Sequence, residues 1–304
     1  MIPRTWSIRR LVAGILLACL VPAAALAEGP VKVVASFSIL GDMVKNVGGD
    51  RVAVTTLVGP NQDTHVYEPK PSDARALAEA GLVFVNGLGF EGWMPRLVTA
   101  SGTKGKTVVA SRGVTTRTMI DEDADGGKIT DPHAWQDLSN GTRYVANIEQ
   151  ALSQADPEGA EVYKANAKAY TAKIEAMDAW VKAEFANIPK AERKIITSHD
   201  AFGYFGQAYG VTILAPMGFS TESEASAKNV GTLIRQIKQE KVKALFIENM
   251  SDPRLIERIA QETGTKVGGA LYSDALSAPD EPGGTYLDMF RNNAGKMAAA
   301  MAGQ

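Results

Sequence analysis

Three histidines and one aspartate are the residues of this chain whose types and placement best fit metal chemistry. The 304-residue sequence contains only three histidines, His65, His133 and His199, each in a loop-like segment near the end of an expected strand or helix. Asp274 lies in the same kind of segment, and consecutive members of the set are 68, 66 and 75 residues apart. Three imidazoles and one carboxylate complete the coordination of a tetrahedral transition metal and leave no position open. The set therefore predicts a site that holds a metal rather than one that uses it for catalysis.

Taken singly, each of these residues has a more ordinary explanation. A lone histidine is usually a surface or hydrogen-bonded side chain, and an aspartate after a strand is usually a helix N-cap. The contexts of the four residues are alike, however, because each follows an expected strand or lies on a loop stiffened by proline, as with Pro60, Pro69 and Pro132. The joint pattern favours one shared site to which different strand–helix units each contribute a ligand.

The elements that would position these ligands alternate between short β-rich runs and longer amphipathic segments. In the first half, strands are expected at residues 31–36, 52–58, 82–85 and 107–109, and helices at 38–47 and 72–80. In the second half, strands are expected at 194–198, 211–214, 244–247 and 267–271, and helices at 230–240 and 253–263. This alternation predicts an α/β fold of two (β/α) lobes with parallel sheets. A ligand site is then expected in the cleft between the lobes, outside the carboxyl ends of the strands.

One long helical segment separates the two halves. Residues 158–186 are rich in Ala, Lys and Glu, Pro157 can occupy the first turn, and Pro189 follows the end. At 1.5 Å per residue this helix would be on the order of 45 Å long, which spans a small domain. We interpret it as a rigid bridge between two lobes, with a solvated coiled-coil arm as the alternative. The expected division is a leader at 1–27, an N-terminal lobe at 28–156, the connecting helix at 157–188 and a C-terminal lobe at 189–304.

The first 27 residues have the features of an export signal. Arg4, Arg9 and Arg10 form a basic start, an apolar run follows at residues 11–25, and a small-x-small cleavage motif ends at Ala27. The run is too short and too poorly flanked for a transmembrane helix. We expect cleavage after Ala27 and a periplasmic mature protein, with lipoprotein processing at Cys19 as the alternative. Cys19 is the only cysteine, so cleavage after Ala27 excludes disulfides and thiolate ligands.

The charge of the chain argues against a nucleic-acid partner. The formal net charge is −2, and the leader contains three arginines and no acidic residue, so the mature chain would be more acidic still. Nucleic-acid binding depends on basic residues that neutralise phosphates. No feature of the sequence indicates more than a monomer.

Four of the loop segments resemble the metal-ligand segments of a known family. These are residues 63–69 (DTHVYEP), 131–135 (DPHAW), 198–205 (SHDAFGYF) and 272–274 (YSD). They are similar to segments of the periplasmic zinc and manganese solute-binding proteins of ABC transporters, the cluster A-I or TroA-like family. The likeness extends over essentially the whole expected mature chain, including the long helix.

This resemblance implies a fold, a ligand set and a set of partners. The fold is two (β/α) lobes bridged by one long helix, and the metal ligands carried over are His65, His133, His199 and Asp274. The implied partners are a membrane permease and its cytoplasmic ATPase, and a periplasmic metallochaperone is left open as a further partner. The implied function is high-affinity capture of a metal and its delivery to the permease for import.

Zinc is the metal that this ligand set favours. Family members tuned for manganese or iron usually carry a glutamate at the third ligand position, where this chain has His199. Imidazoles suit zinc, whereas manganese prefers more oxygen ligands and a higher coordination number. We expect one Zn²⁺ per chain, and a manganese or mixed manganese and zinc carrier is the alternative.

Several residues near the ligands have roles that the sequence leaves open. Residues 121–127 (DEDADGG) stand where many zinc members have a His-rich loop, and they are either a weak cation collector or a solvated loop. Glu222 and Glu224 are candidates for a second loop at the cleft. The carboxylates placed to orient the imidazoles are Asp63, Asp131, Asp200 and Glu248. The aromatic residues expected to pack around the site are Trp135, Phe202, Tyr204 and Phe205.

Two other classes of protein compete with a transport component. A zinc hydrolase would need an open coordination position and a general base, and the chain has no His-Glu-x-x-His motif. We therefore do not expect an enzyme. An adhesin that keeps the metal as a structural element is the other alternative. A hydrolase would turn over chromogenic esters, an adhesin would bind host matrix, and a carrier would do neither.

Overall fold

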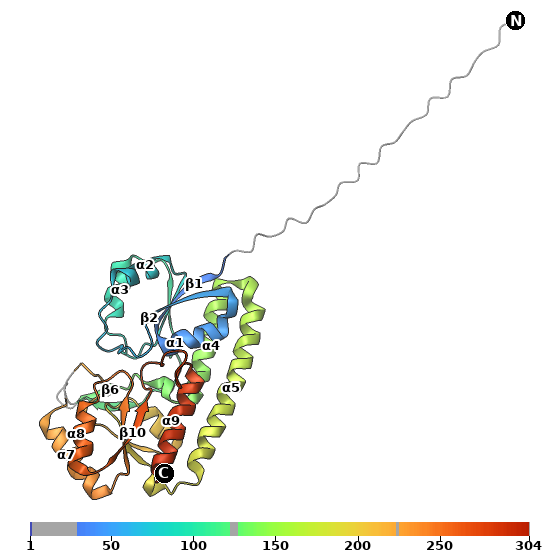
Figure 1. Cartoon of the computed structure of the whole chain (residues 1–304). Helices are drawn as coiled ribbons and strands as arrows, with labels where there is room; N and C mark the ends of the chain where they lie inside the picture. The colour runs from blue at the N-terminus through green and yellow to red at the C-terminus, as the bar shows by residue number, and fades with distance from the viewer. Residues whose placement is uncertain (2–28, 122–126, 223–224, 304) are drawn as a thin grey trace.

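Two parallel four-stranded sheets form the framework of the computed structural model, which describes residues 1, 29–121, 127–222 and 225–303 (Figure 1). The first sheet has the order β2-β1-β3-β4, from β1 (Val31–Phe37), β2 (Val52–Val58), β3 (Leu82–Val85) and β4 (Lys106–Val109). The second has the order β10-β9-β7-β8, from β7 (Lys194–Ile196), β8 (Thr212–Leu214), β9 (Ala244–Glu248) and β10 (Lys266–Leu271). The predicted α/β fold with two parallel sheets is confirmed, and each predicted strand lies within about two residues of an observed one.

Helices cover the faces of both sheets, which explains why the central strands are almost wholly apolar. The first sheet carries α1 (Ser38–Gly48), α2 (Pro71–Glu79) and α3 (Met94–Ser101). The second carries α6 (Gly203–Tyr209), α7 (Ala227–Glu240), α8 (Arg254–Thr263) and α9 (Tyr286–Met301). Polar N-caps begin several helices, because a side-chain oxygen accepts an unpaired backbone N–H there. Ser226 does this for α7 and Thr285 for α9.

A long helix runs beside both sheets, as the sequence predicts. Helix α4 (Leu138–Ala155) is followed by a 3₁₀ turn, η3 (Pro157–Gly159), and then by α5 (Ala160–Ala186). With 27 residues, α5 is about 40 Å long. It packs against α1 and α4 toward one end and against α9 toward the other (Figure 1). Helix α6 also contacts it. The exact boundaries of the lobes stay a prediction.

One buried carboxylate ties α5 to helices of both halves. Asp42 of α1 accepts a hydrogen bond from the Tyr170 hydroxyl of α5 at 3.2 Å and from the backbone N–H of Tyr286, at the start of α9, at 3.1 Å. Burial raises the pKa of Asp42 despite these donors. Helices α1, α5 and α9 are therefore held together at one point between the sheets.

Some elements were not expected from the sequence. The segment before His133, where no strand was expected, includes an antiparallel hairpin of β5 (Thr118–Asp121) and β6 (Gly127–Thr130). Its strands have only four residues each, too few for a clear alternation of apolar and polar side chains. Helices α4 and α9 were also missed. Residues 122–126 of the acidic segment and residues 2–28, which hold nearly all of the expected leader, lie outside the described residues. In the described part of the chain, no helix has the length and apolarity needed to cross a membrane.

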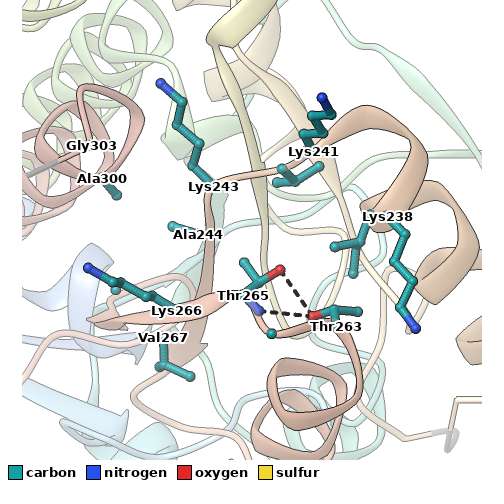
Figure 2. A pocket seen from close by; sticks show the side chains of 14 residues that line it. Lys238, Lys241, Lys243, Ala244, Thr263, Thr265, Lys266, Val267, Ala300 and Gly303 are labelled. Carbon is teal, nitrogen blue, oxygen red and sulfur yellow. Dashed lines mark hydrogen bonds between the residues drawn. The ribbon is translucent and has the colours of Figure 1, made fainter.

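A lysine-rich pocket lies at the amino ends of β9 and β10 (Figure 2). It has a volume of about 520 Å³, and the lysines that line it are Lys238, Lys241, Lys243 and Lys266. Helices α7 and α8 both end at this pocket, so the lysines offset the partial negative charge of their carboxyl ends. Lys243 also pairs with Glu192 at 2.5 Å and donates to the backbone oxygen of Met301 at 2.8 Å. These contacts account for the basic lining as part of the fold.

Candidate metal centre

The three histidines and Asp274 meet at one place between the two sheets. His65 lies in the loop after β2, His133 precedes the short helix η2 (Ala134–Gln136), His199 follows β7, and Asp274 follows β10. One ligand atom from each residue lies within 4.8 Å of the others. The side chains of His133, His199 and Asp274 are 0% exposed, and that of His65 is 4% exposed. The structure thus brings together all four residues singled out from the sequence.

Asp274 lies at the centre of this cluster. Its Oδ2 atom is 3.1 Å from Nε2 of His65 and 3.1 Å from Nε2 of His199, and its Oδ1 atom is 3.7 Å from Nε2 of His133. Nε2 of His65, Nε2 of His133 and Oδ1 of Asp274 are buried without a hydrogen-bond partner among the described residues. Buried polar atoms are rarely left unpaired in folded proteins. A cation bound between these atoms would satisfy all of them, so the donor set fits a metal ion.

A carboxylate fixes the orientation of His133. Oδ1 of Asp131 lies 2.8 Å from Nδ1 of His133 and accepts the backbone N–H of the same residue at 2.9 Å. Its other oxygen pairs with the guanidinium of Arg117. Burial alone would raise the pKa of Asp131, but the contact with His133 and the charge of Arg117 hold it below its usual range. A proton kept on Nδ1 leaves the Nε2 lone pair free to face the cluster.

A second carboxylate does the same for His199. Oε2 of Glu248 lies 2.6 Å from Nδ1 of His199, and Oε1 accepts the backbone N–H of His199 at 3.0 Å. The Ser273 hydroxyl donates to Oε2 at 2.5 Å, which fixes the carboxylate in turn. Burial alone would lower the pKa of His199, but Glu248 and Asp274 outweigh it and raise this pKa well above its usual range. Burial alone would likewise raise the pKa of Asp274. His199 and His133 outweigh burial and hold this pKa far below its usual range.

His65 is held through its backbone and by aromatic packing. Oδ1 of Asp63 accepts the His65 backbone N–H at 2.9 Å, and the indole of Trp93 donates to the Thr64 oxygen at 2.9 Å, which anchors the loop. The imidazole packs edge-on against Phe90, with ring centroids 5.0 Å apart, and against Phe219, at 6.2 Å. These apolar rings keep water from the least buried ligand.

The other residues expected around the site divide into those that contact it and those that do not. Trp135 packs against His133 with centroids 5.4 Å apart, and its indole donates to the Ser273 oxygen at 3.0 Å. Tyr204 donates to the backbone oxygen of Asp131 at 3.2 Å. Phe202 and Phe205 instead pack against each other, and Phe205 also against the core ring of Phe185 in α5.

Three of the acidic residues named from the sequence make no hydrogen bond to a histidine of the cluster or lie outside the described residues. The backbone of Asp200 donates to the Gly218 oxygen at 3.0 Å, and burial raises the pKa of its carboxyl. Glu222 is exposed, and Glu224 lies outside the described residues. Phe90 and Phe219 were missed. Phe90 could have been found, because it follows β3 at the carboxyl edge of the first sheet, where ligands of parallel sheets bind.

The fold and the cluster together define a solute-binding protein, with two parallel sheets, one bridging helix and a buried cluster of candidate metal ligands between the carboxyl ends of the strands. A family described as "Zinc-uptake complex component A periplasmic" matches residues 33–300. The chain belongs to this family, which confirms the resemblance read from its loop segments. It is accordingly a solute-binding component and not an enzyme.

Individual relatives carry the names of two metals. The manganese ABC transporter substrate-binding lipoprotein PsaA of Streptococcus mitis is 36% identical over 277 residues, which cover 89% of each chain. The structure of the periplasmic zinc binding protein TroA from Treponema pallidum has a TM-score of 0.84 and 30% identity, covering 90% of this chain and 99% of that one. The Mn-bound periplasmic metal binding protein from Candidatus Liberibacter asiaticus has a TM-score of 0.79 and 31% identity, covering 88% and 98%. Likeness alone therefore does not select the metal.

Proposed function

We propose that this protein captures Zn²⁺ outside the cytoplasm and delivers it to the permease of an ABC transporter for import. The ligands of the proposed site are His65, His133, His199 and Asp274. One observation carries the proposal: four ligand atoms from distant parts of the chain lie within 4.8 Å of one another in a buried cluster. Three of the site's polar atoms lack any other partner among the described residues. This is the arrangement expected for a closed four-ligand zinc site.

Manganese is the second candidate, and one feature of the site favours it. Both oxygens of Asp274 face imidazoles, so a two-oxygen contact from this carboxylate would give five ligand atoms. A higher coordination number with more oxygen suits manganese. The names of several relatives point the same way. Three imidazoles against one carboxylate remain the reason to place zinc first.

The residues of the site perform the binding without a chemical reaction. Asp131 and Glu248 each hold a proton on Nδ1, so His133 and His199 present Nε2 lone pairs to the cation. The two carboxylates also offset part of the charge that a divalent ion brings into a buried space. Trp135 and Phe90 exclude water on one side, which strengthens each electrostatic contact.

The processing of the leader and the partners are part of the same proposal. We infer cleavage after Ala27, and the relatives named lipoproteins add weight to the alternative, processing at Cys19. Mass spectrometry of the N-terminal peptide, on protein from the native compartment, distinguishes cleavage after Ala27 from processing at Cys19. The expected partners are the permease and its ATPase.

Metal content, measured by mass spectrometry on protein purified without added metal, tests the proposal. Wild type should carry close to one zinc per chain, and His199→Glu should gain manganese relative to zinc because an oxygen ligand replaces an imidazole. Glu240→Gln, which alters a surface carboxylate of α7 far from the cluster, is the matched control and should keep the wild-type content. Wild-type protein that takes up no zinc on titration would contradict the four-ligand site.

A further inference from the structure

A short segment after β8 crosses from His199 to the loop that carries His65. We call residues 217–221 the strap. Met217 forms a β-bridge with His199, and the next residue, Gly218, accepts the N–H of Asp200, so the strap begins against the second sheet. The ring of Phe219 then lies 6.2 Å from that of His65.

The far end of the strap is fastened to the other half of the molecule. The hydroxyl of Thr221 donates to Oδ2 of Asp63 at 2.5 Å. The other oxygen of Asp63 accepts the backbone N–H of His65 at 2.9 Å. One carboxylate thus joins the strap to the loop that carries His65, and loss of the Thr221 contact would detach the strap from that loop.

The strap covers the least enclosed side of the ligand cluster. His65 is the one ligand of the four with any exposure, 4% against 0% for the others. The remaining sides are closed by parts of the packed interior. Phe90 and Trp135 cover one of them, and Glu248 and Ser273 cover another, all buried. A route for a metal ion through those sides would require the core to open, whereas the side at His65 is closed by Phe219.

An open groove lies behind the strap. It has a volume of about 910 Å³, and its walls include Met217, Gly218, Phe219 and Ser220 of the strap. The opposite walls come from Ile120 of the β5–β6 hairpin, from Arg117 just before it, and from α7, with Leu233. Phe219 therefore faces His65 on one side and borders unfilled space on the other. A rotation of the ring into the groove would therefore be directed toward open space and away from the packed core.

We propose that the strap is the gate through which the metal enters and leaves, and that Thr221 is a positioning residue that keeps the gate shut. This inference rests on the proposed function, because it assigns a route to the ion held by the four ligands. Opening consists of the loss of the Thr221–Asp63 hydrogen bond and rotation of Phe219 into the groove. Movements of loops on this scale expose a site without hinge motion of whole domains.

Rates of metal exchange in Thr221→Val test the gate. The variant keeps the shape of the side chain and removes the hydroxyl, so the closed state loses one hydrogen bond. Association and dissociation of Zn²⁺ should both accelerate, by about five- to tenfold, the factor that corresponds to one such bond. The dissociation constant should stay within about threefold of wild type, because both rates change together. Stopped-flow mixing with a zinc-binding dye, in both directions, measures the two rates.

A second pair of variants tests the ring itself. Phe219→Ala should accelerate both rates more than Thr221→Val, and Phe219→Leu, which keeps an apolar plug, should restore values near wild type. Thr212→Val is the matched control, because Thr212 is an exposed threonine of β8 on the same sheet, and its rates should not change. Thermal unfolding of the metal-free variants checks that folding is intact.

The possible results separate the gate from the proposed function. Unchanged rates in both Thr221→Val and Phe219→Ala would overturn the gate. A faster dissociation with unchanged association would also overturn it, because Thr221 would then stabilise only the bound site. Wild-type protein that binds no metal in an equilibrium titration would overturn the proposed function, and this result is obtained before any rate is measured.

Discussion

The proposed ligands of the site are held in two different ways. His133 and His199 each have a carboxylate on the far ring nitrogen, and each of those carboxylates also accepts the backbone N–H of the same histidine. His65 depends on a loop, on aromatic packing and on a hydrogen bond to its own backbone N–H. The difference indicates a site in which two histidines are fixed and a third can adjust. A binding protein needs both properties, because a fixed set selects the ion and an adjustable ligand lets it pass.

The two kinds of ligand also differ in the elements that carry them. His199 and Asp274 directly follow β7 and β10, so the second sheet positions them almost without intervening loop. His65 lies seven residues beyond the end of β2 and is covered by the strap. Side chains at strand ends are positioned more accurately than side chains on loops. The two kinds of ligand should therefore respond differently to substitution.

Asp274→Asn should have the largest effect. It removes the one anionic ligand from the centre of the cluster, where the carboxylate lies within 3.7 Å of all three imidazoles. Zinc affinity should fall by more than the factor of about 100 that loss of a supporting residue can cost. Isothermal titration or competition with a chelator of known affinity measures the change. Binding within tenfold of wild type would show that Asp274 is not a ligand.

The carboxylates that orient the rings come next. Glu248→Gln and Asp131→Asn should each lower zinc affinity by about 10- to 100-fold, because the imidazole loses its fixed tautomer and orientation. Glu192→Gln, a change in a surface carboxylate paired with Lys243, should have no effect and serves as the control. Equal affinity in all three variants would remove the distinction between fixed and adjustable ligands.

The pH dependence of binding tests the fixed half directly. The pKa of His199 is raised well above its usual range by Glu248 and Asp274, despite burial. Metal binds only the neutral imidazole, so zinc affinity should begin to fall as pH drops while still above the usual histidine pKa of about 6.5. Titrations in buffers of different ionisation enthalpy should show proton release on binding near neutral pH. Binding without proton release would contradict this assignment.

The folding stability of the metal-free protein should depend on the protonation of His199 in the opposite direction. A histidine whose folded pKa is raised adds stability at pH values below its unfolded pKa, and that stability is lost as pH rises through the folded pKa. Asp274, whose pKa is lowered, adds stability above its unfolded pKa, and this is lost as the pH falls. Thermal unfolding of metal-free wild type and of Glu248→Gln measures the difference. The scans cover roughly pH 6 to pH 9, the range in which a histidine with a raised pKa loses its proton.

Asp156→Asn should have the smallest effect on the site. Asp156 pairs with Arg51 at 2.8 Å next to the start of α5, and this contact lowers the pKa of Asp156 to about 2. A lowered pKa adds stability above the unfolded value, which is lost as the pH falls toward 2. The variant should unfold at a slightly lower temperature at neutral pH and bind zinc like wild type. A change in affinity would mean that this end of α5 is coupled to the ligands.

The sequence was sufficient to predict the elements whose pattern is local. The strands, the long helix and the four clustered residues could be found because apolar runs, proline boundaries and rare histidines are visible one segment at a time. The strap could not be found, since the contact between Thr221 and Asp63 joins residues far apart in the chain and depends on how two loops meet. Phe90 and Phe219 were missed for the same reason. Phe202 and Phe205 illustrate the converse, because nearness in sequence to His199 did not place them at the rings.

The length of α5 has a consequence for how a transporter would recognise this protein. A helix of 27 residues that packs on both halves should keep the distance between the sheets nearly constant. A carrier with such a frame has almost the same outline when it is empty and when it is loaded. Empty molecules should then compete with loaded ones for the same docking surface, so the rate of import would depend on the ratio of the two forms as well as on the concentration of metal.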